Sequence, residues 1–185
     1  MTLGSAMAAD LMAEVQPLIP VLRRYARSML RDRDLADDLV QDCLERVIGH
    51  WDERRRSEDT RQWVFAIAHN LAVNKLRQEN RRGMHVAIED VDEATMVCPA
   101  NQEDRVRHNE LMRALDTLPP DQRSVVLMIS VEDLSYAEVA EALGVPVGTV
   151  TSRLARGRER LRRALDGELH QAERPQGTPM LHRLK

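Results

Sequence analysis

The stretch SYAEVAEALGVPVGTVTSRLARGRERLRRAL, residues 135–165, contains the local signals that decide the fold of this chain. Ser135 and Glu138 have the spacing of a capping box, which starts a helix, and Gly144 suits the left-handed position that ends one. Pro146 fits the first turn of a following helix, so a tight turn joins two helices. These signals in a row predict a helix-turn-helix.

The second helix of this motif separates its apolar residues from its hydroxyl and guanidinium groups. The predicted buried stripe consists of Val147, Val150, Leu154, Leu161 and Leu165. A second stripe faces solvent and consists of Thr149, Ser152, Arg153, Arg156, Arg160 and Arg163. Such groups contact phosphates and base edges when a recognition helix enters the major groove of DNA. A solvated arginine-rich helix is the alternative for the arginine run alone, but the turn signals favour DNA contact.

Composition places the rest of the chain among helical proteins. The 185 residues are 43% hydrophobic, 31% charged and only 3% aromatic, with a net charge of −3. No segment approaches the roughly 18 apolar residues of a membrane span, and the N-terminus lacks the pattern of a signal peptide. We therefore expect a cytoplasmic protein without direct membrane insertion. Cys43 and Cys98 are too few for a disulfide framework or a zinc site, and Cys43 is expected in the core.

The chain divides at an acidic segment. Residues 10–82 read as successive helices, whereas residues 83–104 contain six carboxylates, no Lys or Arg and no sustained period. A second helical domain is predicted over residues 105–166, followed by a tail over residues 167–185. The expected fold is all-α, with two small helical domains joined by a flexible acidic linker.

In the first domain, the segment DLADDLVQDCLERVIGHW, residues 34–51, predicts a helix with a strongly acidic face. Its inward positions are Leu39, Val40, Cys43, Val47 and Trp51, and the opposite face collects Asp34, Asp38, Gln41, Asp42 and Glu45. An acidic face repels DNA and suits a protein partner. A solvated surface is the alternative for this face taken alone.

The next helix, RQWVFAIAHNLAVNKLRQENRR over residues 61–82, combines an aromatic, amides and arginines in one stripe. This stripe consists of Trp63, Asn70, Asn74, Arg77 and Arg81. Such a mixture can stack on unpaired bases while holding the backbone, as single-strand binders do. The competing interpretation is that Trp63 simply belongs to the core.

These residues resemble a known family. DLADDLVQDCLERVI followed by WVFAIAHNLAVNKLRQENRR resembles region two of bacterial sigma factors, the subunits that direct RNA polymerase to promoters. LPPDQRSVVLMISVEDLSYAEVAEALGVPVGTVTSRLARGRERLRRAL, residues 118–165, resembles their region four. With only these two regions and a short linker, the chain resembles an extracytoplasmic-function (group IV) sigma factor over about residues 15–165.

The resemblance implies three binding surfaces and two kinds of partner, polymerase and promoter DNA. The clamp helices of the core RNA polymerase would contact Asp37, Asp38, Leu39, Gln41, Asp42 and Glu45. The minus-ten element, both double- and single-stranded, would contact Trp63, Asn70, Asn74, Lys75, Arg77 and Arg81. The minus-thirty-five element would contact Thr149, Thr151, Ser152, Arg153 and Arg156. The resemblance also implies an anti-sigma factor as an inhibitory partner.

Three positions depart from the family pattern and concern promoter preference. Many relatives have Arg at the position of His69, Asp at that of Asn74 and Lys at that of Thr151. We therefore expect a promoter preference that differs from that of such relatives.

Three other functions are less consistent with these residues. A helix-turn-helix regulator that is not a polymerase subunit would need a sensory first half, and residues 1–82 lack the strand pattern of a receiver. A helical adaptor without DNA contact would give no promoter-specific transcript. An enzyme is not expected, because His50, His69, His85 and Cys43 lack metal-ligand spacing and no nucleophile motif occurs. No cofactor or metal is expected.

Overall fold

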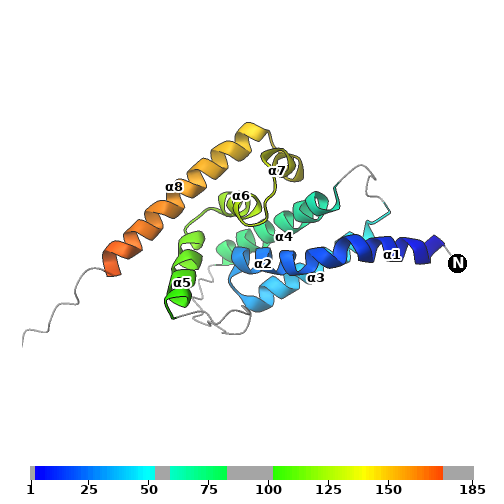
Figure 1. Ribbon diagram of the computed structural model, residues 1–185, viewed down its shortest axis with the longest axis horizontal. Coiled ribbons are helices and arrows are strands. Elements are labelled where there is room, and N and C mark those ends of the chain that lie inside the picture. The colour runs from blue at the N-terminus through cyan, green and yellow to red at the C-terminus, as the bar shows by residue number, and fades with distance from the viewer. Residues whose placement is uncertain (1–2, 53–58, 83–101, 173–185) are drawn as a thin grey trace, which may run out of the picture.

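The computed structural model describes residues 3–52, 59–82 and 102–172, and all regular elements in this part of the chain are helices. The elements are α1 (Leu3–Val15), a short 3₁₀ helix η1 (Gln16–Leu18), α2 (Ile19–Leu30), α3 (Arg33–Gly49), α4 (Thr60–Arg82), α5 (Gln102–Asp116), α6 (Pro120–Ser130), α7 (Tyr136–Leu143) and α8 (Val147–Ala172) (Figure 1). The prediction of an all-α fold is confirmed.

Helices α1–α4 form an N-terminal domain, in which α2, α3 and α4 pack on one another. Asp32 caps α3 by accepting a hydrogen bond from the Leu35 backbone N–H at 2.9 Å. Tyr25 of α2 and Phe65 of α4 meet edge to face, with ring centroids 5.4 Å apart. Cys43 is fully buried, as expected, and burial raises the pKa of its thiol to about 12. This thiol is therefore an inert core group.

Helices α5–α8 form a C-terminal domain that contains the predicted helix-turn-helix in α7 and α8. The Ser135 hydroxyl accepts from the Glu138 N–H at 3.2 Å, and the Glu138 carboxylate accepts from the Ser135 N–H at 2.6 Å. Gly144 ends α7 in the left-handed conformation, with φ of 62°. Both local signals are therefore confirmed.

Two details of the predicted motif were wrong. Pro146 does not lie within the first turn of α8, because the helix begins one residue later, at Val147. The Pro146 carbonyl instead accepts the hydrogen bond of the Thr149 N–H at 2.8 Å. Val147 is exposed rather than buried, whereas Val150 and Leu154 are buried as predicted, and Leu161 and Leu165 are half-buried.

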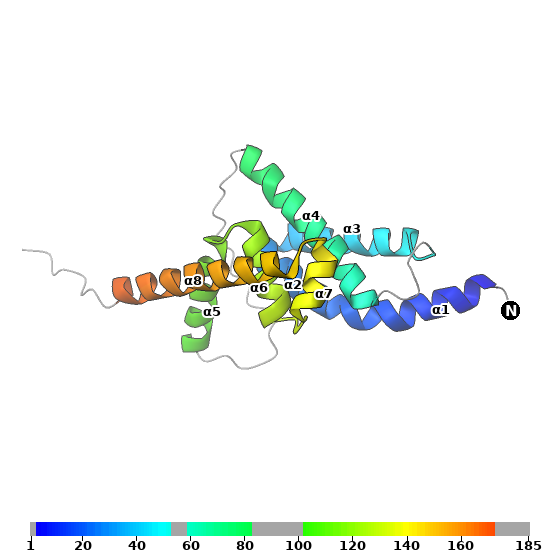
Figure 2. The same ribbon diagram turned by 90° about the horizontal axis from the view of Figure 1, so that it is seen from above.

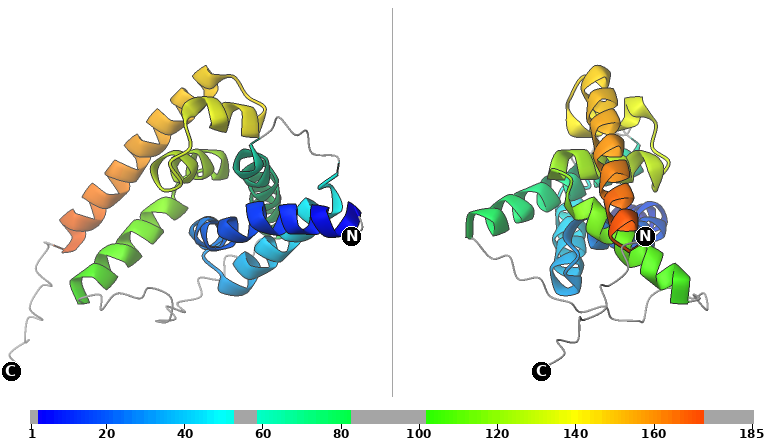
Figure 3. Two further views of the ribbon diagram at one scale, coloured as in Figure 1. Left: turned by 45° about the vertical axis from the view of Figure 1, so that its right-hand side comes forward. Right: turned by 90° about the vertical axis from the view of Figure 1, so that its left-hand side faces the viewer.

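The two domains pack against each other. Helix α6 lies against α2 and α4, and α7 lies against α4 (Figures 2 and 3). As a result, a single buried apolar cluster runs from Leu22 and Phe65 in the N-terminal domain to Val125 and Val139 in the C-terminal domain. The sequence predicted two domains but did not predict this interface.

The ends of the C-terminal domain differ from the expected bounds. Helix α5 begins at Gln102, so residues 102–104 are helical although they were assigned to the linker. The rest of the predicted linker, residues 83–101, lies outside the described residues. Helix α8 continues to Ala172, so the first six residues of the predicted tail, 167–172, extend the helix.

Gly157 allows α8 to approach α6 closely, which leads to a prediction about stability. A Cβ at this position would lie 2.8 Å from Cγ2 of Val126, whose β-branched side chain has little freedom to move. We expect Gly157→Leu to destabilise the protein by roughly 1–3 kcal/mol through overpacking. Gly157→Ala should destabilise it less, because Ala regains about 1 kcal/mol of helix propensity.

The midpoint of thermal unfolding, followed by circular dichroism, measures this effect. Gly167→Ala is the matched control, because nothing lies within 4 Å of a Cβ added at Gly167 in the same helix. The control should leave the midpoint unchanged or raise it. A midpoint for Gly157→Leu equal to that of the control would contradict the close approach of the two helices.

Candidate protein and nucleic-acid interfaces

The predicted acidic face of α3 is present on the surface. Asp37, Asp38, Gln41 and Glu45 are exposed, and Asp42 is half-buried at the edge. Two of the carboxylates have basic neighbours, because Asp37 lies 3.8 Å from Arg27 of α2 and Asp42 lies 3.7 Å from the Lys75 ammonium of α4. Asp34, Asp38 and Glu45, which are all exposed, therefore carry most of the outward negative charge of this acidic face.

Leu39 does not belong to this acidic face, although the resemblance implied that it contacts the polymerase. Its side chain is fully buried in the core between the helices of the N-terminal domain. The periodicity of the segment had already placed Leu39 inward with Val40 and Cys43, and the structure agrees with that pattern. Leu39 therefore supports the acidic face from beneath.

Three of the residues predicted for the polar stripe of α4 lie together on the surface. Asn70, Asn74 and Arg77 are exposed at three- and four-residue spacing, so they lie on one side of the helix. We call these three residues the α4 stripe. Arg81 lies in the last turn of α4, where side chains are outside the described part of the chain.

The other two residues predicted for the minus-ten element lie differently. Lys75 is half-buried, and its ammonium points to α3, where it contacts the Leu35 carbonyl at 3.5 Å and Asp42 at 3.7 Å. The implied DNA contact of Lys75 is therefore not supported in this arrangement. Trp63 is half-buried and packs on the core beside Trp51, with ring centroids 6.3 Å apart. The structure therefore agrees in part with the interpretation of Trp63 as a core residue, because its side chain is half-buried.

The residues predicted for the minus-thirty-five element lie together at the start of α8. Thr151 and Arg156 are exposed, while Thr149, Ser152 and Arg153 are partly exposed. The Arg156 guanidinium donates to the Ser152 carbonyl and to the Ser152 hydroxyl, each at 3.1 Å. The Arg153 guanidinium lies 3.6 Å from the Asp121 carboxylate at the start of α6. This cluster presents hydroxyls and guanidinium groups on one helix, as predicted.

Sequence reasoning missed a buried polar cluster at the domain interface. The Ser124 hydroxyl of α6 lies 2.8 Å from the Tyr25 hydroxyl and 2.7 Å from Nδ1 of His69. All three residues are buried. Burial lowers the pKa of His69 to about 4, and the nearby Arg153 and Arg77 lower it further, while Asp121 opposes the shift. His69 is therefore neutral at physiological pH.

The lowered pKa of His69 predicts loss of stability in acid. His69 binds its proton near pH 6.5 in the unfolded state but only near pH 4 in the folded state. The contribution of His69 to the free energy of unfolding is therefore fully present above pH 6.5 and decreases as the pH falls from 6.5 to 4. At pH 5 the free energy of unfolding should be about 2 kcal/mol lower than at pH 7.5 on account of this group.

Urea unfolding of the wild type and of His69→Gln at both pH values isolates this contribution. Gln retains a hydrogen-bonding group near Ser124 but does not titrate, so the variant should lose about 2 kcal/mol less than the wild type on acidification. Identical pH dependence of the two proteins would show that His69 is not held neutral at the interface.

Two features do not occur among the described residues. None of the helices in residues 3–52, 59–82 and 102–172 is both long and apolar enough to span a bilayer. Within the same ranges, no group of three or more His, Cys, Asp or Glu side chains is placed to hold a metal ion.

An acidic surface on one domain and a helix-turn-helix in the other are consistent with a transcription initiation subunit, and comparison with known proteins shows that class. Residues 108–161 match the family described as Sigma-70, region 4, and residues 15–69 match the Sigma2 domain of PhyR. The chain is 32% identical to the ECF RNA polymerase sigma factor EcfG of Rhodopseudomonas palustris, over 87% of this chain and 86% of that protein. The protein belongs to the extracytoplasmic-function family of RNA polymerase sigma factors.

Further relatives support the family assignment. The chain is 28% identical to RNA polymerase sigma factor SigV of Bacillus subtilis, over 78% of this chain and 84% of that protein. Its structure resembles that of the sigma factor RpoE in complex with the anti-sigma factor NepR from Bartonella quintana, with a TM-score of 0.69 and 29% sequence identity. This similarity covers 85% of this chain and 97% of that chain. The chain is thus a sigma factor that directs RNA polymerase to promoters.

Proposed function

We propose that each of the three polar surfaces makes a different contact during transcription initiation. The acidic face of α3 binds the core polymerase, the α4 stripe binds the minus-ten element, and the start of α8 reads the minus-thirty-five element. The observation that carries this proposal is the segregation of charge, since exposed carboxylates gather on α3 while exposed amides and guanidinium groups gather on α4 and α8. The acidic face of α3 repels DNA and suits a protein partner, whereas the faces of α4 and α8 with guanidinium groups attract the phosphates of DNA.

The resemblance of this chain to inhibited sigma factors supports a protein inhibitor. The RpoE of Bartonella quintana was solved with the anti-sigma factor NepR bound to it. We infer that an anti-sigma factor likewise holds this protein inactive by covering surfaces of both domains. The protein acts in the cytoplasm as a subunit of polymerase and has no catalytic activity, cofactor or metal of its own.

Reconstitution with core polymerase tests the function directly. Purified protein added to core enzyme and fragmented genomic DNA should yield transcripts whose 5′ ends map to a small set of promoters. A helix-turn-helix regulator that is not a polymerase subunit would yield no such transcripts without another sigma factor. Omission of the protein provides the background.

Arg156 provides a test of the assignment of α8. Its guanidinium is exposed and is held over Ser152 by hydrogen bonds, so it is oriented before DNA arrives. If Arg156 contacts a base, Arg156→Ala should weaken binding of the preferred upstream sequence by ~1–3 kcal/mol and relax the preference at one position. If it contacts a phosphate, all sequences should weaken equally and the salt dependence should decrease.

Fluorescence anisotropy with upstream duplexes distinguishes the two kinds of contact. Arg162→Ala is the matched control, because Arg162 lies in the same helix but pairs with Glu159 at 2.6 Å, outside the predicted recognition residues. Unchanged affinity and unchanged preference for Arg156→Ala would remove Arg156 from the DNA interface.

A further inference from the structure

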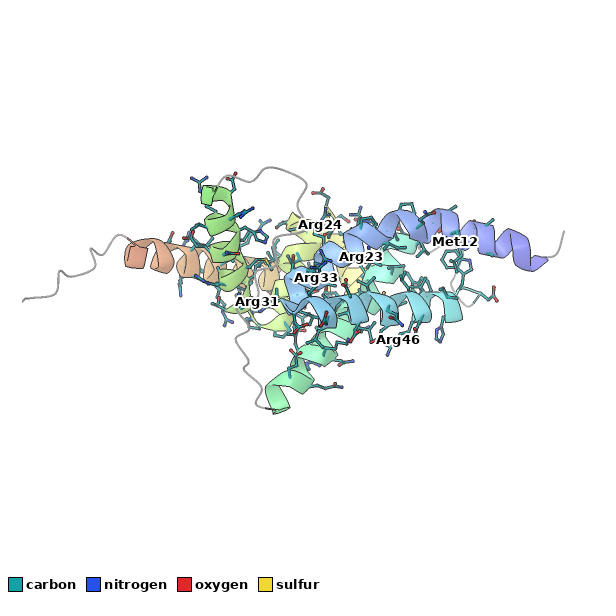
Figure 4. All side chains as sticks on the ribbon, turned by 90° about the horizontal axis from the view of Figure 1, so that it is seen from below. Met12, Arg23, Arg24, Arg31, Arg33 and Arg46 are labelled. Atoms are coloured by element: carbon teal, nitrogen blue, oxygen red, sulfur yellow. The ribbon has the colours of Figure 1, made fainter. Side chains whose placement is uncertain are left out.

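The first turns of α8 expose apolar groups among their polar side chains. Exposed arginines lie on the N-terminal domain, as Figure 4 shows for Arg23 on α2 and Arg33 on α3. On α8, the exposed Thr151 has the exposed Val147 four residues before it and the exposed Ala155 four residues after it. Residues four apart lie on the same side of a helix. Thr151 therefore lies between two apolar side chains, on the surface assigned to the minus-thirty-five element.

The Thr151 hydroxyl is turned toward its own helix. It donates its hydrogen to the Val147 carbonyl, with the two oxygens 3.1 Å apart. Threonines on helices often make this bond to the preceding turn. The Cβ atom of threonine carries one hydroxyl and one methyl group, so a hydroxyl held against the backbone leaves the methyl group at the exposed surface. Thr151 therefore offers DNA an apolar group.

The neighbouring serine hydroxyl is also engaged within α8. Ser152 donates to the Thr149 carbonyl at 3.0 Å and accepts from Nη2 of Arg156 at 3.1 Å. A hydroxyl has a single hydrogen to donate, and here the backbone carbonyl accepts it. Ser152 therefore holds the Arg156 guanidinium instead of donating to a base. Polar contacts to bases fall to the guanidinium groups, and Thr151 adds a methyl group beside them.

The major groove of DNA contains one apolar group that a methyl group of the protein can recognise. This group is the C5-methyl of thymine, and the side chains that contact it include alanine and the methyl group of threonine. A lysine, which many relatives have at the position of Thr151, would instead donate to the acceptors of guanine. The departure at Thr151 therefore changes the preferred group from a hydrogen-bond acceptor to a methyl group.

We propose that Thr151 is a specificity-determining residue for the minus-thirty-five element, and that its methyl group contacts the C5-methyl group of a thymine. Val147 and Ala155 flank this contact and extend the apolar surface around it. The Thr151 hydroxyl stays bonded to the Val147 carbonyl and does not contact the base. Burial of one methyl group changes an affinity by about fourfold, so one thymine should be preferred over uracil by this factor. This assignment rests on the proposed function of α8.

Replacement of thymine by deoxyuridine tests the contact, because it removes the C5-methyl group and leaves the base pair intact. The full-length protein is combined with core polymerase and titrated with fluorescent promoter duplexes from the reconstitution. In these duplexes each thymine of the minus-thirty-five element, on either strand, is replaced in turn. One replacement should weaken binding of the wild type by about fourfold. Fluorescence anisotropy measures the affinities.

Two substitutions of Thr151 separate its methyl group from its hydroxyl. Thr151→Val keeps a methyl group and removes the hydroxyl, so it should retain the preference for thymine over uracil. Thr151→Ser keeps the hydroxyl and removes the methyl group, so its preference should fall to about twofold or less. Thr117→Ser is the matched control, because Thr117 is exposed and its hydroxyl donates to the Ala114 carbonyl at 2.7 Å, but it follows α5. It should behave like the wild type.

Three results would overturn the methyl contact while the proposed function stands. These are sequence-specific binding that tolerates uracil at every position, a full preference for thymine in Thr151→Ser, and loss of this preference in Thr151→Val, which would assign recognition to the hydroxyl. If polymerase with the bound protein shows no preference for any minus-thirty-five sequence, the proposed function of α8 is wrong, and the methyl contact is wrong with it. Circular dichroism checks that each variant is folded like the wild type.

Discussion

Reversal of two charges on α3, Asp38→Lys with Asp42→Lys, should weaken binding to core polymerase by on the order of 100-fold or more. Asp38 is exposed on the acidic face, and Asp42 lies at its edge. The reversal replaces attraction by repulsion at two neighbouring contacts with a basic partner surface. Promoter-specific transcription should fall to background at protein concentrations that saturate the wild type. Titration against fluorescently labelled core enzyme measures the loss of affinity.

The control for this experiment keeps the change in net charge but moves it to the other domain. Asp104→Lys with Glu141→Lys reverses two exposed carboxylates in α5 and α7. Because Asp42 also lies 3.7 Å from Lys75, the thermal stability of the α3 variant must be compared with that of the wild type. Asp38→Lys alone avoids this neighbour and should show part of the effect. Equal affinities for all variants would exclude the α3 face from the polymerase interface.

Local signals in the sequence were sufficient to predict the helix-turn-helix. A capping box connects groups three residues apart, and a left-handed glycine acts on its own turn, so neither depends on the rest of the fold. The same holds for the α4 stripe, because helical spacing alone places Asn70, Asn74 and Arg77 on one side. Features that one helix determines by itself were therefore predictable.

Contacts between distant segments were not predictable by the same reasoning. The carboxylate of Glu132, between α6 and α7, is buried and accepts hydrogen bonds from the Arg24 guanidinium of α2. The two residues are 108 positions apart in the sequence, and a lone carboxylate in a polar loop normally remains in water. Lys75 lies next to the α4 stripe in the helix, but its long side chain reaches sideways to Asp42 of α3. The family resemblance implied that Leu39 belongs to the acidic face, although helical periodicity places it inward, and the structure shows it buried. For Glu132 and Lys75, contact with a second element decides the position of the side chain, whereas the buried position of Leu39 follows from its own helix.

Asn70→Ala and Arg77→Ala should each reduce formation of the open promoter complex by about tenfold. A reduction of this size corresponds to the loss of one hydrogen bond to a charged group or of one oriented base contact. Separation of the strands unstacks bases at a cost of a few kcal/mol per step, and new contacts to the free strand must offset it. Asn70 provides donors and acceptors for a base, and Arg77 provides a guanidinium for a phosphate. Permanganate reactivity of unpaired thymines near minus ten measures the open complex.

Glu79→Ala is the control, because Glu79 is partly exposed on α4 but its helical position places it on the side opposite the α4 stripe. It should leave permanganate reactivity unchanged. Binding of core polymerase should be the same for all three variants, since α3 carries the proposed polymerase contact. Transcription from a template with an already separated minus-ten region should be largely restored in the Asn70 and Arg77 variants.

The two substitutions differ in what they change in the folded protein. Arg77 lies 3.9 Å from Asp121 across the domain interface, so Arg77→Ala removes this contact as well as the proposed DNA contact. The thermal stability of the Arg77 variant must therefore be compared with that of the wild type. Asn70 is exposed on the α4 stripe, and its substitution is expected to affect melting only. Wild-type permanganate footprints for both variants would remove α4 from the melting step and leave polymerase binding as the proposed role of the N-terminal domain.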